Sequence, residues 1–171
     1  MSFLQSIFGE RKQRSALEPL YRRVVEAARD PAWYRAGAVP DTMDGRFDMV
    51  SSVLALVLLR LEHQDERTGA VLLTELFIDD MDGTMRQIGI GDHVVGKKVG
   101  RMMSALGGRL AAYREAKDEE AFEAAVRRNI FRDEPPSRSA LAFVAARLAE
   151  FRTALQAMAA DDLLAGRLPR I

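Results

Sequence analysis

Residues 47–61 read FDMVSSVLALVLLRL and contain the most apolar stretch of the chain, VLALVLL at 53–59. Apolar residues recur there at the spacing of one helical face: Phe47, Val50, Val53, Leu54, Val57, Leu58 and Leu61. Further apolar residues fill much of the opposite side: Met49, Ala55, Leu56 and Leu59. A helix that is apolar on nearly all sides is surrounded by other elements. We therefore predict that this segment is the central helix of a bundle.

The rest of the chain has the same helical periodicity. No segment of any length alternates apolar and polar residues, as a half-buried strand would. A length of 171 residues is enough for one well-packed domain and short for two. We therefore predict an all-α fold, a single compact bundle of about six to seven helices that spans residues 1–171.

The other expected helices follow from apolar periodicity and from capping residues. We place them at residues 14–29, 69–81, 93–115 and 118–131, after Pro135 and Pro136, and in short pieces around Trp33 and at 161–166. Asp92 is the expected N-cap of the helix from 93, and Ser137 or Ser139 that of the last long helix. The turn-rich residues 37–45 predict a loop.

Charge and the N-terminus limit the partners and the location of the protein. The chain has 25 basic and 25 acidic residues, so no global field favours nucleic acid, and we expect no such partner. The N-terminus places apolar residues before basic ones, the reverse of a secretory signal, so we expect a cytoplasmic protein, with a peripheral position at the inner membrane as a further option. Residues 1–14 carry a short amphipathic patch: Phe3, Leu4, Ile7 and Phe8 with Arg11, Lys12 and Arg14. Weak membrane contact and docking onto the bundle are both open for this patch.

One segment is close to a nucleotide-binding motif. Residues 91–98 read GDHVVGKK, which departs from the phosphate-binding loop because Lys98 replaces the hydroxyl that would ligate magnesium. The preceding residues, TMRQIGI at 84–90, do not form the apolar strand that such a loop requires. We interpret the segment as a glycine turn followed by the start of a helix.

The sequence contains few residues at the spacing that a metal or cofactor site requires. The acidic run DDMDG at 79–83 places Ile78 and Gly89 at two ligand positions of a calcium loop, which removes two essential oxygens. His63 and His93 lack the spacing that places two ligands on one helical face. The chain has no cysteine. We therefore expect that the protein is not an enzyme and has no cofactor or metal site. The alternative hypothesis is a small helical enzyme or metal-binding protein that uses the acidic cluster Asp79–Asp92.

Charge is distributed unevenly around this acidic cluster. Residues 75–92 contain five acids and one base. The acids are Glu75, Asp79, Asp80, Asp82 and Asp92, and the base is Arg86. The next helix is basic: Lys97, Lys98, Arg101, Arg109 and Arg114. Three of the acids are expected at or just after a helix end, where the helix dipole disfavours carboxylates. Pairing within the chain and a polar rim around a protein-binding groove both explain this pattern.

The basic helix also has a small residue at every fourth position: Gly96, Gly100, Ser104, Gly108 and Ala112. Glycine inside a helix costs about 1 kcal/mol relative to alanine, so close packing should compensate for it. The small residues could pack closely against a helix of the same bundle, or against a helix of a partner protein, and both explanations are open.

Two blocks of the sequence resemble the ubiquinol–cytochrome c chaperone family. They are PDTMDGRFD at 40–48 and ELFIDDMDGTMRQIGIGDHVVGKKVGRMMSALGGRLAAY at 75–113, and the likeness covers roughly residues 20–150. Positions that match the family block are Asp79, Asp80, Asp82, Arg86, Gly89, Gly91, Asp92, Lys97 and Arg109. Gln87 and the pair Leu106 and Gly107 depart from the family pattern.

This resemblance implies a function. Members of the family are assembly factors of the respiratory cytochrome bc complex, and the chain is similar to the compact bacterial type. The resemblance thus implies a non-enzymatic chaperone that holds cytochrome b, or a similar membrane protein, during insertion and haem loading. Together with the charge pattern it gives these candidate client-binding residues: Asp79, Asp80, Asp82, Arg86, Asp92, Lys97, Gly100, Arg101 and Arg109.

Overall fold

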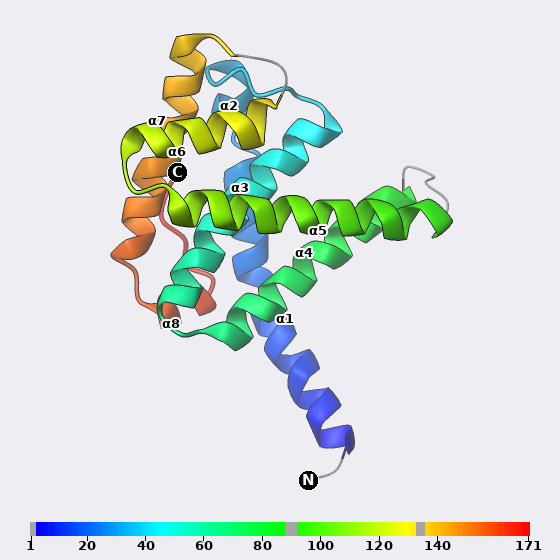
Figure 1. The fold of residues 1–171 in the computed structure, drawn as a ribbon. Helices are drawn as coiled ribbons and strands as arrows, with labels where there is room; N and C mark the ends of the chain where they lie inside the picture. The colour runs from blue at the N-terminus through cyan, green and yellow to red at the C-terminus, as the bar shows by residue number, and fades with distance from the viewer. Residues whose placement is uncertain (1–2, 88–91, 133–135) are drawn as a thin grey trace.

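The computed structural model describes residues 3–87, 92–132 and 136–171, and for residues 3–11 and 92–94 it describes the backbone alone. The elements are α1 (Phe3–Ala28), α2 (Pro31–Arg35), α3 (Met43–His63), α4 (Arg67–Gln87), α5 (Asp92–Glu115), α6 (Glu119–Val126), the π-helical turn η1 (Arg127–Phe131), α7 (Arg138–Gln156) and α8 (Ala160–Leu164) (Figure 1). The described residues contain no strand. The predicted all-α fold is confirmed.

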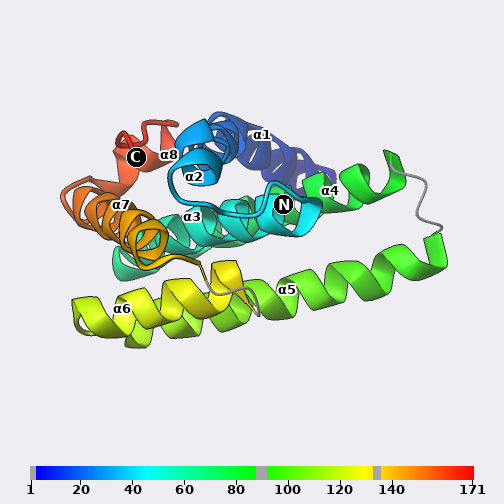
Figure 2. The ribbon, with the colours of Figure 1, turned by 90° about the horizontal axis from the view of Figure 1, so that it is seen from above.

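Helix α3 occupies the centre of the bundle, as its apolar pattern predicts. Every residue from Phe47 to Leu58 is buried, and α3 contacts α1, α4, α5, α7 and η1. The helix begins after Thr42, whose Oγ1 accepts a hydrogen bond from the Gly45 amide at 3.1 Å. Figure 2 shows α5 and α6 on one side of α3, and α1, α2 and α8 on the other.

The ends of α4 and α5 that face residues 88–91 project beyond the rest of the bundle (Figures 1 and 2). We call α4 and α5 together the α4–α5 hairpin. It carries the acidic cluster on α4 and the small-residue positions on α5. This arrangement places most of the sequence-predicted site on one extension of the molecule.

Three helices are longer than the sequence predicted, and α3 begins at Met43, inside the predicted loop at 37–45. Helix α4 ends at Gln87 rather than near 81, because Phe77, Met81 and Met85 continue its inward stripe at four-residue spacing. Asp79, Asp80 and Asp82 therefore lie inside a helix, and the argument that they follow its end was wrong. Helix α1 begins at Phe3 rather than at 14, so the N-terminal patch continues the first helix.

Of the predicted N-caps, Ser137 takes its expected role, and the side chain of Asp92 lies outside the described residues. The Ser137 hydroxyl accepts a hydrogen bond from the Ala140 amide at 3.2 Å and begins α7. Asp118 begins α6 through the Ala121 amide at 2.8 Å. The segment predicted as one helix at 118–131 instead changes from α6 to the π-helical turn η1. The predicted short pieces are present as α2 and α8.

Candidate binding surface

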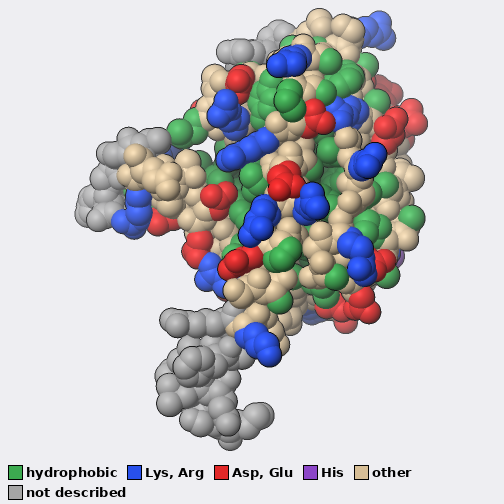
Figure 3. Space-filling model, turned by 180° about the vertical axis from the view of Figure 1, so that it is seen from behind, with side chains coloured by type: hydrophobic (Ala, Val, Ile, Leu, Met, Phe, Trp, Pro, Cys, Tyr) green, Lys and Arg blue, Asp and Glu red, His purple; other side chains and the backbone are tan. Residues whose placement is uncertain are grey.

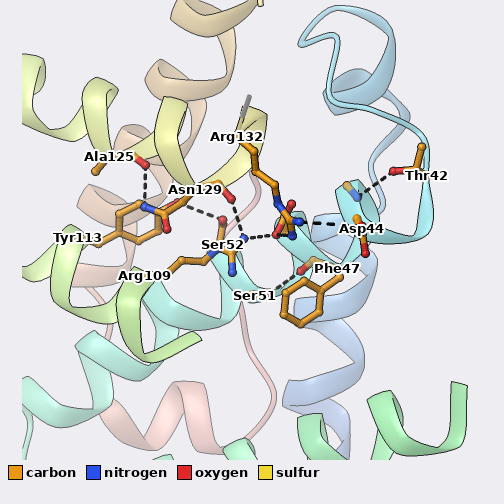
Figure 4. A network of polar contacts seen from close by, with 12 residues as sticks. Thr42, Asp44, Phe47, Ser51, Ser52, Arg109, Tyr113, Ala125, Asn129 and Arg132 are labelled. Carbon is orange, nitrogen blue, oxygen red and sulfur yellow. Dashed lines mark hydrogen bonds and ion pairs between the residues drawn. The ribbon is translucent and has the colours of Figure 1, made fainter. Parts of the chain in front are cut away.

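A buried ionic network joins α3, α5 and η1. Asp48 is 1% exposed and Arg109 is 2% exposed. Arg109 Nη2 donates to Asp48 Oδ1 and, at 2.6 Å, to the Asn129 carbonyl. Arg132 Nη2 donates to the same carboxylate oxygen at 2.8 Å (Figure 4). Burial raises the pKa of Asp48, and the two arginines oppose that rise. Arg109 is thus part of the core, although the sequence placed it among the client-binding candidates.

Arg109 also has hydrogen-bonding capacity that no described atom uses. Its guanidinium lies over the Phe47 ring, 5.4 Å from the ring centre. Its Nε and Nη1 atoms are buried and have no hydrogen-bond partner among the described residues. Native proteins rarely leave buried donors unsatisfied, so this feature calls for an explanation.

The acids of the α4 cluster have partners within the chain. The Asp79 carboxylate accepts a hydrogen bond from Arg14 Nη2. Asp80 Oδ2 accepts from the Tyr21 hydroxyl at 2.7 Å, and Asp82 Oδ2 accepts from Arg86 Nε at 2.7 Å. Burial raises the pKa of Tyr21, and the bond to Asp80 raises it further. Two of these contacts hold α1 against α4, so intramolecular pairing accounts for much of the charge pattern.

The acidic cluster shows no arrangement that would hold a metal ion. Within residues 3–87, 92–132 and 136–171, no three His, Asp or Glu side chains with a described position gather closely enough to hold one. The side chain of Asp92, and Gly89 and Gly91, lie outside the described residues. In the same ranges, each helix is too short or too polar to cross a bilayer.

One face of α5 consists of small residues that are open to solvent. We call it the glycine face; its members are Gly96, Gly100, Ser104, Gly107 and Gly108, all exposed. A Cβ atom added at any of its four glycines would meet no described atom within 4 Å. Packing against a helix of the same bundle, one of the two predicted explanations, is therefore wrong for these residues. Ala112, the next small position, is buried and lies outside this face.

A hollow lies beside the glycine face, between α5, the start of α3, the end of α4 and η1. We call it the basic pocket; its volume is about 530 Å³. Its apolar lining includes Met43, Phe47, Met85 and Met102. Its basic lining comprises Lys98, Arg101, Arg109, Arg128 and Arg132. The opposite side of the molecule differs, because basic and acidic side chains alternate over it (Figure 3).

The structure brings some predicted residues together and adds others. Arg101 and Arg109 line the basic pocket, whereas Lys97 and Gly100 are exposed nearby on α5. Sequence reasoning did not single out the pocket methionines, or Arg128 and Arg132, because they come from segments far apart in the chain. A signal for Met43, Phe47 and Asp48 was nevertheless present, since all three lie in the block PDTMDGRFD.

Comparison with known proteins shows the family to which the chain belongs. A family model described as ubiquinol-cytochrome C chaperone matches residues 35–170. The chain belongs to the ubiquinol–cytochrome c chaperone family. The crystal structure of the Cbp3 homolog from Brucella abortus is similar to this chaperone, with a TM-score of 0.80 and 29% sequence identity. That match covers 99% of this chain and 97% of the Brucella chain. No curated protein matches the chain.

Family membership supports a chaperone role for this protein. The matched range contains the whole glycine face and every residue of the basic pocket. Both surfaces therefore lie in the part of the chain that the family model matches.

Proposed function

We propose that this chaperone is not an enzyme and that it holds cytochrome b, a hydrophobic membrane subunit, during assembly of the cytochrome bc complex. We further propose that a helix of this client lies along the glycine face of α5. The observation that carries the proposal is the exposure of four glycines in the middle of a long helix.

These glycines need an explanation from outside the chain. Each lowers helix stability by about 1 kcal/mol relative to alanine, and no described neighbour requires its small size. Helices of membrane proteins approach one another closely where both present small residues. A transmembrane helix of the client is thus a partner that would use the glycine face.

The surroundings of this face suit an apolar client with a polar border. Lys97 and Arg101 are exposed beside it and supply charged groups at its edge. Asp79 is 63% exposed despite its contact with Arg14. We therefore propose Asp79, Asp80, Asp82 and Asp92 as an acidic edge of the client surface, together with Arg86, which pairs with Asp82. Arg109 supports this surface from the core.

The location follows from the client. A protein that holds a membrane subunit works at the membrane surface, and we propose a peripheral position at the inner membrane. The first turns of α1 project from the bundle and provide a candidate contact with lipid (Figure 1).

A substitution on the glycine face tests the proposal. Gly100→Leu fills the space that the client helix would occupy, and a Cβ atom at this exposed position meets no described atom within 4 Å. We expect this variant to keep its melting temperature and to lose most of the cytochrome b that co-purifies from detergent-solubilised membranes. Ala146→Leu on the exposed side of α7 is the matched control and should retain the client. Equal recovery of cytochrome b with Gly100→Leu would remove the glycine face from the client surface.

A further inference from the structure

We propose that the basic pocket binds one anionic phospholipid, with the phosphate among the basic residues and the first part of the acyl chain over the methionines. The inference does not rest on the client proposal, because it concerns a different ligand, although Arg101 and Gly108 belong both to the pocket and to the proposed client surface. It combines three observations: excess positive charge, a buried guanidinium with unused donors, and an adaptable apolar lining.

Among the described residues, the positive charge in the pocket exceeds the negative charge. Lys98, Arg101 and Arg128 line the pocket, and none of them forms an ion pair with a described acid. Asp44 is the acid of the lining and lies 3.9 Å from Arg132, facing solvent. Asp48 is already shared by two arginines. An anion entering the pocket would therefore meet cations that have no counter-charge among the described residues.

Arg109 makes the pocket more than a basic surface. It is buried, it lines the pocket, and its Nε and Nη1 donors have no acceptor among the described residues. A guanidinium presents paired donors that match the oxygens of a phosphate. A phosphate near Arg109 would satisfy donors that the folded chain leaves unused.

The apolar lining indicates that the anion carries a hydrocarbon chain. Met43 is 46% exposed at the edge, and Phe47, Met85 and Met102 complete the apolar wall. Methionine is flexible and polarisable, which suits a ligand without a fixed shape such as an acyl chain. The volume lies within the range of small-ligand sites, about 300–1,000 Å³. A free phosphate would leave this apolar wall unused.

Titration of the full-length protein with short-chain lipids tests the proposal. The probe is dihexanoyl phosphatidylglycerol below its micelle concentration, and the readout is NMR of methyl-labelled methionine. We expect saturable shifts of the Met85 and Met102 methyl signals. Dihexanoyl phosphatidylcholine, which is zwitterionic, and glycerol phosphate, which lacks the chains, should each bind about ten-fold more weakly.

Charge removal provides the second arm. Arg101→Gln with Arg128→Gln changes two exposed residues and should weaken phosphatidylglycerol binding about ten-fold. Arg22→Gln with Arg35→Gln removes two exposed charges outside the pocket and should leave the affinity unchanged. If the first double variant melts early, Lys98→Gln replaces it. Gly100→Leu, and deletion of residues 1–10, should also leave this affinity unchanged, which separates the pocket from the client surface and the N-terminus.

Four outcomes would overturn the proposal. Equal binding of the zwitterionic lipid would show that charge does not select the ligand. Equally tight binding of glycerol phosphate would define a site for a free oxyanion. Unchanged affinity in the Arg101 and Arg128 variant would place the lipid elsewhere. Displacement of the lipid by a soluble acidic peptide that binds more tightly would assign the pocket to a protein segment.

Discussion

At the scale of single residues, Arg109 is a buried charge that joins α5 to α3 and η1. Its removal would leave Asp48 buried with Arg132 as its remaining charged partner. We expect Arg109→Met to lower the free energy of unfolding by about 3 kcal/mol, because a buried charge loses a partner. Arg132 is 48% exposed, so Arg132→Gln should cost about 1 kcal/mol. Urea denaturation measures the free energy of unfolding of both variants. Equal losses of this free energy would contradict a larger role for Arg109 than for Arg132.

Asp30 supplies a second prediction, which concerns pH. It begins α2 by accepting a hydrogen bond from the Ala32 amide at 2.8 Å, and it also accepts one from Arg147 at 3.1 Å. The Ala32 amide first, and then Arg147, lower the pKa of Asp30 below its ordinary value of 3.8. The carboxylate therefore stabilises the fold above that value, and this contribution is lost as pH falls through the lowered pKa.

The matched variant for this effect is Asp30→Asn, which keeps a capping side chain but cannot ionise. We expect wild type to exceed it in stability by about 0.5–1 kcal/mol at neutral pH, because the charged contact with Arg147 is lost. The difference should shrink below pH 3.8. Urea unfolding at several pH values measures it, and a difference independent of pH would show that ionisation of Asp30 does not contribute.

At the scale of elements, the glycines of α5 predict a conflict between stability and function. Gly100→Ala and Gly107→Ala should each raise the free energy of unfolding by about 1 kcal/mol, because alanine favours helix and nothing described opposes its methyl group. Gly37 is the contrast, since a Cβ there would lie 2.5 Å from the Trp33 carbonyl oxygen and from Val144. Gly37→Ala should therefore destabilise the protein. Thermal melting distinguishes these outcomes, and destabilisation by Gly100→Ala would mean that the glycine face is covered within the chain.

The N-terminal part of α1 gives a second prediction at this scale. Its first turns project beyond the other helices (Figure 1), whereas Arg14 contacts Asp79 on α4. Deletion of residues 1–10 should reduce binding to anionic vesicles and leave the melting temperature nearly unchanged, because the contact at Arg14 is retained. A large fall in melting temperature would show that the segment packs against the bundle.

At the scale of the whole molecule, the α4–α5 hairpin contributes to three of the surfaces described above. Asp79 and Asp80 contact α1, the glycine face is proposed for the client, and the basic pocket is proposed for a lipid. Exposed ion pairs contribute about 0–1 kcal/mol, so the ion pairs of Asp79 and Asp82 can give way to partner binding without loss of the fold.

Charge reversal tests whether the acids also reach the client. Asp79→Lys with Asp82→Lys should keep the fold, because exposed pairs contribute little, and should abolish recovery of cytochrome b. Glu115→Lys with Glu150→Lys reverses two exposed acids on other helices and is the control. Early melting of the first variant would show that these acids act mainly within the chain. An unchanged client yield would remove them from the binding surface.

The sequence alone determined the helical elements and the family. Apolar spacing is a local property, so the stripe of α3 predicted a central helix before any contact was known, and two blocks of sequence indicated the chaperone family. The length of α4 was misjudged because Met81 and Met85, which extend its stripe, lie among acids and a glycine.

Only the tertiary structure decided how the site is assembled. Asp79 and Asp80 contact Arg14 and Tyr21, which are 65 and 59 residues away. The basic pocket likewise combines side chains from α3, α4, α5 and η1. The helical repeat gives the faces of one helix, but it contains no information about which face a distant segment covers. The exposure of the glycine face and the burial of Arg109 on the same helix could therefore emerge only from packing.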